Sequence, residues 1–311
     1  MKLEFEELYS QIEQNQKETF TEISKKMKEE SNRNIMISLI ICIIIDLIMI
    51  FKFWNTMNKF MIFFPIIIID IVIFALIFAV FSKNQREYNR LFKENVISAL
   101  INNFYDDLYF SPKSNMPRSI YDEARYDEYY NRYNSEDYFR GKIENRYDIQ
   151  MAEVKTEKEE THRDSDGKTR TERYLKFHGL FAKIKMEKSL QTSLQIRGNF
   201  KTSESRVKMD SQEFEKYFDV ASDNKIITMQ ILTHDVMEML ISFLQDTNLK
   251  FDISIYGTDM YFRFFTGEMF EAVSFKDGNF DKEKLKKYYD VIEFTYVLSR
   301  KIIELIEQAK I

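Results

Sequence analysis

The chain is poor in the residues on which many functional motifs depend. Its 311 residues include one cysteine, three prolines, seven glycines and three histidines. Because Cys42 is the single cysteine, an intramolecular disulfide and a metal site of several thiolates are both excluded, which suits a reducing compartment. This composition, with abundant Ile, Lys, Asn, Phe and Tyr, is typical of bacteria with AT-rich genomes.

The shortage of glycine and histidine excludes further classes of site. The sequence has no P-loop, no paired-glycine nucleotide turn and no G-x-S-x-G elbow. His162, His178 and His234 are too scattered for an HxxxH or HExxH metal motif, and we expect His178 to pack in the core or lie at a strand edge. We therefore predict no cofactor and no metal, and an enzyme is the least favoured class, although abundant Asp and Glu keep carboxylate-based hydrolysis as an alternative.

The chain also lacks a large excess of charge of either sign. The chain has 45 basic and 50 acidic side chains, a net charge of -5, and the two signs are mixed along the sequence. A protein that neutralises phosphates usually carries a basic stripe, so nucleic acid is not expected as a partner.

Long apolar runs are present, and they are confined to residues 35–81. Ile35 to Phe51 is about long enough to cross a hydrocarbon core about 30 Å thick. Phe60 to Phe81 forms a second run, with Pro65 near its start, and the intervening residues 52–59 carry a tryptophan and two lysines suited to the headgroup region. The pattern predicts a two-helix transmembrane hairpin. A cleaved signal peptide is the alternative, but the first run begins late and lacks a small-residue cleavage site.

Basic residues beside the two runs predict the orientation of the hairpin. Positive charge resists translocation, so the more basic flanks stay in the cytoplasm. Both termini are therefore predicted to be cytoplasmic, in the inner membrane of a bacterium. The flanking residues are Lys25, Lys26, Lys28 and Arg33 before the first run and Lys83, Arg86, Arg90 and Lys93 after the second, against Lys52 and Lys59 in the loop.

Asp46 and Asp70 interrupt the two runs. An ionised carboxylate at mid-bilayer costs about 3 kcal/mol, so neither is expected to face lipid as an anion. In an antiparallel hairpin the two residues would be staggered by about 6 Å, close enough to interact. One reading is hydrogen bonding between helices, within the hairpin or a homo-oligomer; the other is a proton or cation relay.

Outside the apolar block the sequence predicts an α+β protein of antiparallel hairpins and helices. Apolar positions at three-to-four spacing predict helices on both flanks of the membrane block, from Phe5 to Met27 and from Tyr88 to Leu108, which could pair as a stalk. The predicted divisions are an amphipathic cytoplasmic helix at 1–34, the hairpin at 35–81, a stalk and charged helix at 82–134, and the cytoplasmic α+β domain at 135–311.

Within the last division the apolar period changes to two. Residues 143–184 predict a long hairpin with its tip at 161–168, which lacks the acids of an EF-hand, and residues 251–264 predict a second hairpin about Gly257. Ser193 to Arg197 and Arg206 to Met209 are short strand candidates. Thr233 is placed to cap a helix, and a final helix should run from Asp281 to Gln308.

Four short segments resemble a bacterial, membrane-anchored family known only as domain of unknown function number 3137. They are Ser135-Glu136-Asp137-Tyr138-Phe139-Arg140-Gly141, Phe177-His178-Gly179-Leu180-Phe181, Phe218 to Asp223, and Ile231-Leu232-Thr233. The chain departs from the family pattern at Ser135, where glycine is common, and at Gln230, where a small residue is common. The resemblance implies a two-helix anchor with a cytoplasmic domain, and it supplies no catalytic residue. Its candidate site positions are Glu136, Asp137, Gly141, Phe177, Gly179, Phe181 and Asp223.

Three functions follow from these observations. The first is a non-enzymatic scaffold or adaptor that recruits a protein partner near the bilayer. The second is a sensor of a small ligand or lipid headgroup, in which the aromatic hairpins form a cup. The third is a proton-coupled channel component that uses Asp46 and Asp70.

Overall fold

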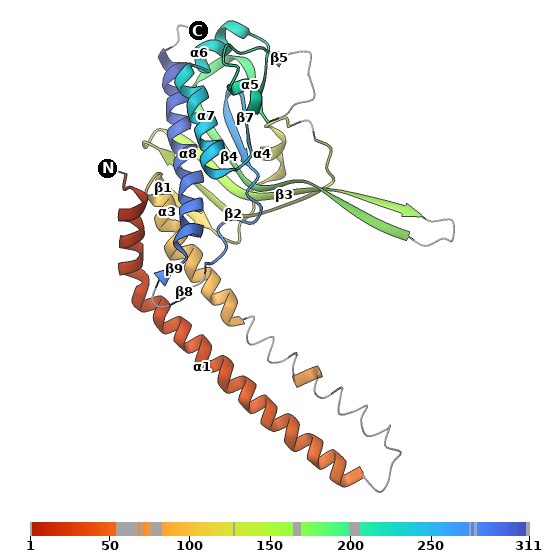
Figure 1. The fold of residues 1–311 in the computed structure, drawn as a ribbon. Helices are drawn as coiled ribbons and strands as arrows, with labels where there is room; N and C mark the ends of the chain where they lie inside the picture. The colour runs from red at the N-terminus through yellow and green to blue at the C-terminus, as the bar shows by residue number, and fades with distance from the viewer. Residues whose placement is uncertain are drawn as a thin grey trace. The chain divides into compact units, whose positions relative to one another are not determined.

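The structure is a computed structural model and describes residues 2–53, 68, 71–73, 75, 83–126, 128–163, 169–198, 206–273, 275–276 and 279–308 (Figure 1). The chain divides into two compact units. The sheet unit comprises residues 1–8, 97–271 and 282–311, and the helical unit comprises residues 9–96 and 272–281.

The longest element is helix α1, Phe5–Phe53. The predicted amphipathic helix and the first predicted span are thus parts of one continuous helix. Its segment Phe5–Ile48 is long and apolar enough to cross a membrane, and its apolar window is not buried at all. Leu39 and Leu47, for example, are 58% and 61% exposed. Solvent exposure of so many large aliphatic groups is unfavourable in water, which favours a lipid environment for this part of α1.

The predicted second span cannot be followed in the same way. Of residues 60–81, the structure describes only 68, 71–73 and 75, all helical, and most of the predicted loop also lies outside the described residues. Among the described residues, α1 is the one helix that is long and apolar enough to cross a membrane by itself. The two-helix hairpin therefore stays a prediction.

The helical unit is held together by an aromatic cluster around Phe20 of α1. The Phe20 ring lies 5.4 Å from Tyr88, which belongs to the helical stretch 83–92, and 5.0 Å from Phe280. Phe280 is part of a small hairpin, β8 (Phe275–Lys276) with β9 (Asn279–Phe280). The hydroxyl of Tyr9 donates to the Phe280 carbonyl at 2.9 Å. The Phe20–Tyr88 contact joins α1 to the helical stretch 83–92, and the stalk itself stays a prediction.

The sheet unit is built on a seven-stranded antiparallel sheet in the part of the chain that the structure describes. The strands follow the order β1-β2-β3-β4-β6-β5, and β7 also pairs with β4. Their bounds are β1 (Asp106–Ser111), β2 (Arg132–Ile143), β3 (Tyr147–Arg163), β4 (Thr169–Arg197), β5 (Arg206–Val207), β6 (Asp219–Ser222) and β7 (Phe251–Phe264). The predicted long hairpin is confirmed as β3 and β4. Of its predicted tip at 161–168, residues 161–163 belong to β3 and residues 164–168 lie outside the described residues.

Strand β7 reverses direction near its middle. The amide of Phe265 donates to the carbonyl of Lys250 at 2.9 Å, so the residues that flank the two ends of the strand are neighbours. Gly257, at φ 58°, lies between the two halves, and glycine tolerates this conformation because it has no Cβ. The predicted hairpin about Gly257 is instead one sharply bent strand, because both halves of β7 pair with β4. The bend brings Asp252 beside Arg263.

Helices pack on the sheet through phenylalanine contacts. α7 (His234–Thr247) begins at Thr233, whose side chain accepts a hydrogen bond from the Val236 amide, as predicted. The ring of Phe243 on α7 stacks at 3.8 Å on Phe294 of α8 (Lys282–Gln308), which also lies 5.3 Å from Phe251. The shorter helices are α3 (Ser98–Asn102), α4 (Arg118–Asp122), α5 (Phe214–Tyr217) and α6 (Lys225–Ile231), with the π-helical turn η1 (Lys93–Ile97) before α3.

Two predictions within residues 82–134 are wrong. The helix expected to continue to Leu108 ends at Asn102, and residues 106–111 form β1, which completes the edge of the sheet by pairing with β2. The expected charged helix is only α4, and β2 begins at Arg132, ahead of the predicted domain boundary at 135. These segments form strands because they pair with neighbouring strands. The spacing of apolar residues alone does not show which strand lies beside a segment.

Candidate functional site

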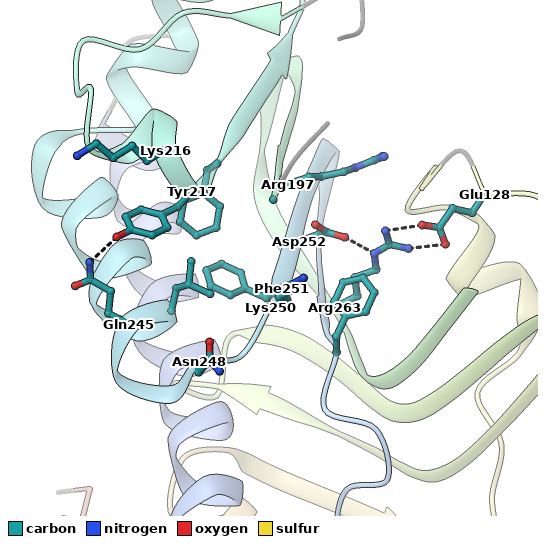
Figure 2. Close-up of a pocket in the computed structure, with 14 residues that line it drawn as sticks. Glu128, Arg197, Lys216, Tyr217, Gln245, Asn248, Lys250, Phe251, Asp252 and Arg263 are labelled. Carbon is teal, nitrogen blue, oxygen red and sulfur yellow. Dashed lines mark hydrogen bonds and ion pairs between the residues drawn. The ribbon is translucent and has the colours of Figure 1, made fainter. Parts of the chain in front are cut away.

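Of two cavities in the sheet unit, the larger lies where both ends of β7 meet α5 and the end of α7 (Figure 2). Its volume is about 680 Å³. The lining combines charged, amide and aromatic side chains from segments far apart in the sequence. They are Glu128, Arg197, Gly198, Lys216, Tyr217, Phe218, Leu244, Gln245, Asn248, Lys250, Phe251, Asp252, Arg263 and Phe265.

Local backbone geometry explains how these segments converge. α7 is followed by Asn248, which adopts the left-handed conformation at φ 51° and turns the chain into β7. Asparagine accepts this conformation more readily than most residues, and it commonly ends helices in this way. The turn, together with the reversal of β7, places Lys250 and Phe265 in hydrogen-bond contact beside the cavity.

A buried charge network forms one wall of the cavity. The guanidinium of Arg263, 3% exposed, donates from Nε to Asp252 at 2.5 Å and from its two terminal nitrogens to Glu128 at 3.1 and 2.9 Å (Figure 2). The same guanidinium lies 4.1 Å from the centre of the Tyr126 ring. Bidentate pairing and a cation–π contact together fix the orientation of Arg263.

The electrostatics of this wall are nearly balanced. Burial raises the pKa of Asp252, and Arg263 and Arg197 oppose that rise. Burial lowers the pKa of Arg263, but Asp252 and Glu128 outweigh it and raise the pKa above its ordinary value. Two arginines therefore offset two carboxylates. Lys216 and Lys250 are exposed, and no described carboxylate pairs with either, so the cavity has a surplus of positive charge.

Another part of the cavity lining, away from the wall formed by the Arg263 network, is aromatic. Phe218 and Phe251 lie with their rings 5.3 Å apart. The hydroxyl of Tyr217 accepts a hydrogen bond from the Gln245 amide at 3.2 Å, which joins α5 to α7 (Figure 2). The cavity thus offers flat apolar surface beside cationic groups, an arrangement that suits an anion with an apolar or ring-bearing part.

A second cavity of about 560 Å³ contains one predicted site residue, Glu136, and His178 from the predicted motif. It lies over strands β2, β3 and β4 and is lined by Pro112, Lys113, Asn115, Asn134, Ser135, Glu136, Glu153, Lys155, His178 and Glu268. The sequence placed these residues in separate motifs and did not indicate that strand pairing brings them together.

The Phe177 to Phe181 motif has a structural role. Phe177 and Phe181 are fully buried, and the ring of Tyr121 from α4 lies 5.8 and 5.0 Å from them. At Gly179 a Cβ would lie 1.9 Å from the Phe264 carbonyl oxygen, so only glycine allows β4 to approach the end of β7 here.

The other motif positions are dispersed. Asp137 is fully buried at φ 53° in an irregularity of β2, where the ladder with β3 shifts register. Gly141 allows close approach of the Asp106 carbonyl, 2.9 Å from where a Cβ would lie. Asp223 follows β6 and accepts a hydrogen bond from Ser193. These three residues line neither cavity.

Only one of the two predicted intramembrane aspartates is among the described residues. Asp46 lies on α1 and is partly buried, and its Oδ1 has no hydrogen-bond partner among the described residues. Asp70 lies outside the described residues. Among His, Cys, Asp and Glu side chains that the structure places, no group of three could hold a metal ion.

Comparison with known proteins gives a match to one family model. Residues 175–307 match the family described as Protein of unknown function (DUF3137). The DUF3137 match supports the resemblance noted in the sequence and contains every lining residue of the larger cavity except Glu128. No curated protein and no solved structure matches the chain.

The sequence contained one signal for the larger cavity that motif searching missed. Asp252 and Arg263 are the charged residues of two strongly apolar runs, Phe251 to Ile255 and Met260 to Phe264. A charge within a buried strand requires a partner. The predicted hairpin about Gly257 would have paired the two residues, because they are symmetric about the turn.

Proposed function

We propose that this chain is a membrane-anchored receptor whose sheet unit binds a small anionic ligand with an apolar part. The observation that carries the proposal is the larger cavity, which combines two exposed lysines with an aromatic lining. Cavities that bind small molecules usually measure about 300–1,000 Å³ and hold a few polar groups among apolar ones. The proposal favours the ligand sensor among the functions considered from the sequence.

The anchor is supported by α1, which is long and apolar enough to cross a bilayer. We propose that both termini face the cytoplasm, as the basic flanks indicate. The ligand is then either the headgroup of an anionic lipid or a soluble carboxylate or phosphate, since both present the same chemistry to Lys216 and Lys250. An enzyme reporter fused after residue 311 and active only outside the cell would contradict this orientation.

Native mass spectrometry of the full chain, purified in detergent, tests the ligand proposal. We expect the protein to retain an anionic molecule, whose mass distinguishes a lipid from a soluble metabolite. Removing two cationic contacts with the double substitution Lys216→Gln and Lys250→Gln should reduce occupancy at least about tenfold, equivalent to about 1.4 kcal/mol.

Lys208→Gln is the matched control, because Lys208 is an exposed lysine that does not line the cavity. Its occupancy should equal that of the unaltered protein, and near-ultraviolet circular dichroism should show the same tertiary signal for all variants. An unaltered protein that carries no anion would contradict the proposal, and so would a double variant that retains the ligand fully.

The scaffold function is a second proposal, favoured by the β3–β4 hairpin. β2 pairs with β3 only as far as Glu157, so residues 158–163 and 169–174 form a two-stranded arm that extends beyond the other strands (Figure 1). Tyr174 and Leu175 at its base are 44% and 58% exposed. Exposed aromatic and aliphatic groups on a projecting arm suit a protein partner. Cross-linking from residue 174 in cells that recovers no specific protein would count against it.

A further inference from the structure

The second cavity is floored by two rows of side chains on one face of the sheet. The strand register places Asn134, Lys155 and His178 opposite one another across β2, β3 and β4. In the neighbouring row Glu136 lies opposite Glu153. Residues two apart on a strand share a face, so both rows point to the same side. The opposite face, with Val154 and Phe177, is buried in the tyrosine-rich core.

A buried carboxylate fixes the imidazole in this floor. Glu153 is 3% exposed, and its Oε1 lies 3.0 Å from Nε2 of His178, while its Oε2 accepts from the Met269 amide at 2.8 Å. Burial and, next, the charge of Lys155 lower the pKa of His178 below its ordinary value, which favours the neutral ring. A neutral ring that donates from Nε2 to Glu153 presents Nδ1 as a hydrogen-bond acceptor.

Charges of both signs surround this imidazole without neutralising one another. Glu136 and Glu268 both act electrostatically on His178, and neither carboxylate has a hydrogen bond or ion pair with a described side chain. Lys113 lines the same cavity and also has no described acidic partner, whereas Lys155 lies 3.7 Å from Glu157. Glu136 and Glu153, directly opposite on adjacent strands, repel each other. A cationic group placed beside them would relieve that repulsion.

We propose that this second cavity binds a small zwitterion that carries an ammonium group and a carboxylate. The ammonium group lies near Glu136 and Glu268, and the carboxylate lies toward Lys113. Nδ1 of His178 accepts a hydrogen bond from the ammonium group. The lining carries three carboxylates and two lysines, which suits a ligand with both charges better than a simple anion or cation. The proposal is independent of the larger cavity.

Histidine-ring NMR of the full chain in lipid nanodiscs tests the proposal, with glycylglycine as the probe. The chain has only three histidines. We expect glycylglycine to shift the signal of His178 saturably and to leave those of His162 and His234 unchanged. Glycylglycinamide lacks the carboxylate and N-acetylglycylglycine lacks the ammonium group, and each should bind at least about tenfold more weakly, the loss expected for one charge-assisted contact.

Substitutions separate a specific site from weak surface binding. The double substitution Glu136→Gln and Glu268→Gln should lower glycylglycine affinity at least about tenfold and remove the preference over the N-acetyl form. Glu283→Gln, an exposed glutamate of α8 outside the cavity, is the matched control and should bind as the unaltered protein does. The absence of a saturable shift, or equal binding of the three probes, would overturn the proposal.

Discussion

Replacing Arg263 with alanine should lower the free energy of unfolding of the sheet unit by about 3–5 kcal/mol, the cost of removing one partner from a buried ion pair. Asp252 is 5% exposed and loses the hydrogen bond from Nε of Arg263 (Figure 2). Glu128 loses both hydrogen bonds of a bidentate pair. The buried carboxylate of Asp252 would then take up a proton, because burial already raises its pKa.

Thermal unfolding of the full chain in detergent, followed by the tyrosine signal in near-ultraviolet circular dichroism, measures this loss. Arg263→Lys keeps the charge but cannot form the bidentate pair, so its midpoint should fall between those of Arg263→Ala and the unaltered protein. Arg146 pairs with Glu187 at the surface, and Arg146→Ala should change the midpoint little. Equal effects of Arg263→Ala and Arg146→Ala would show that the buried network contributes no special stability.

Replacing Gly179 with alanine should also be strongly destabilising and prevent stable folding of the sheet unit. The added Cβ would lie 1.9 Å from the Phe264 carbonyl oxygen and 2.7 Å from the Thr266 amide nitrogen. Both are backbone atoms, and no rotation of a side chain relieves the clash. Separating β4 from the end of β7 would also loosen Arg263, which is adjacent to Phe264. We expect a loss of more than about 3 kcal/mol, beyond the usual cost of overpacking.

Gly267→Ala separates steric overlap from backbone strain. Gly267 has φ 67°, but a Cβ there meets no atom within 4 Å. Its substitution should cost about 1–2 kcal/mol, the price of a left-handed conformation for an ordinary residue. The amount of folded full chain recovered in detergent, judged by size-exclusion chromatography, compares the two. A Gly179→Ala protein as abundant and as stable as Gly267→Ala would refute the close approach of β4 and β7.

Sequence patterns predicted the elements whose signals are local. Thr233 marked the start of α7 because a side-chain cap depends on residues only three positions away. Gly257 marked the reversal of β7 because few other residues adopt its backbone conformation. The apolar stretch of α1 was evident from length alone. In contrast, β1 was mistaken for helix, since its assignment depends on partners in β2 that lie 27 to 36 positions away.

The two cavities were harder to predict because each depends on long-range pairing. Lys216 and Lys250 belong to different elements, and neither has a motif around it. Glu136 was selected through the family resemblance, but its neighbours Glu153 and Lys155 follow only from the register of β2 and β3. Periodicity shows which residues share a face of one strand, and it does not show which strand lies beside it. The chemistry of both sites therefore became visible only in the folded chain.

Membrane attachment through α1 is the claim on which the receptor proposal rests most directly. Alkaline carbonate extraction of cell membranes, followed by ultracentrifugation and detection of the full chain, measures it. We predict that the protein stays in the pellet at high pH and enters the soluble fraction only with detergent, because in the proposed anchor Leu39, Leu47 and the aliphatic residues around them would be surrounded by lipid. Release of the intact chain by carbonate alone would contradict the account.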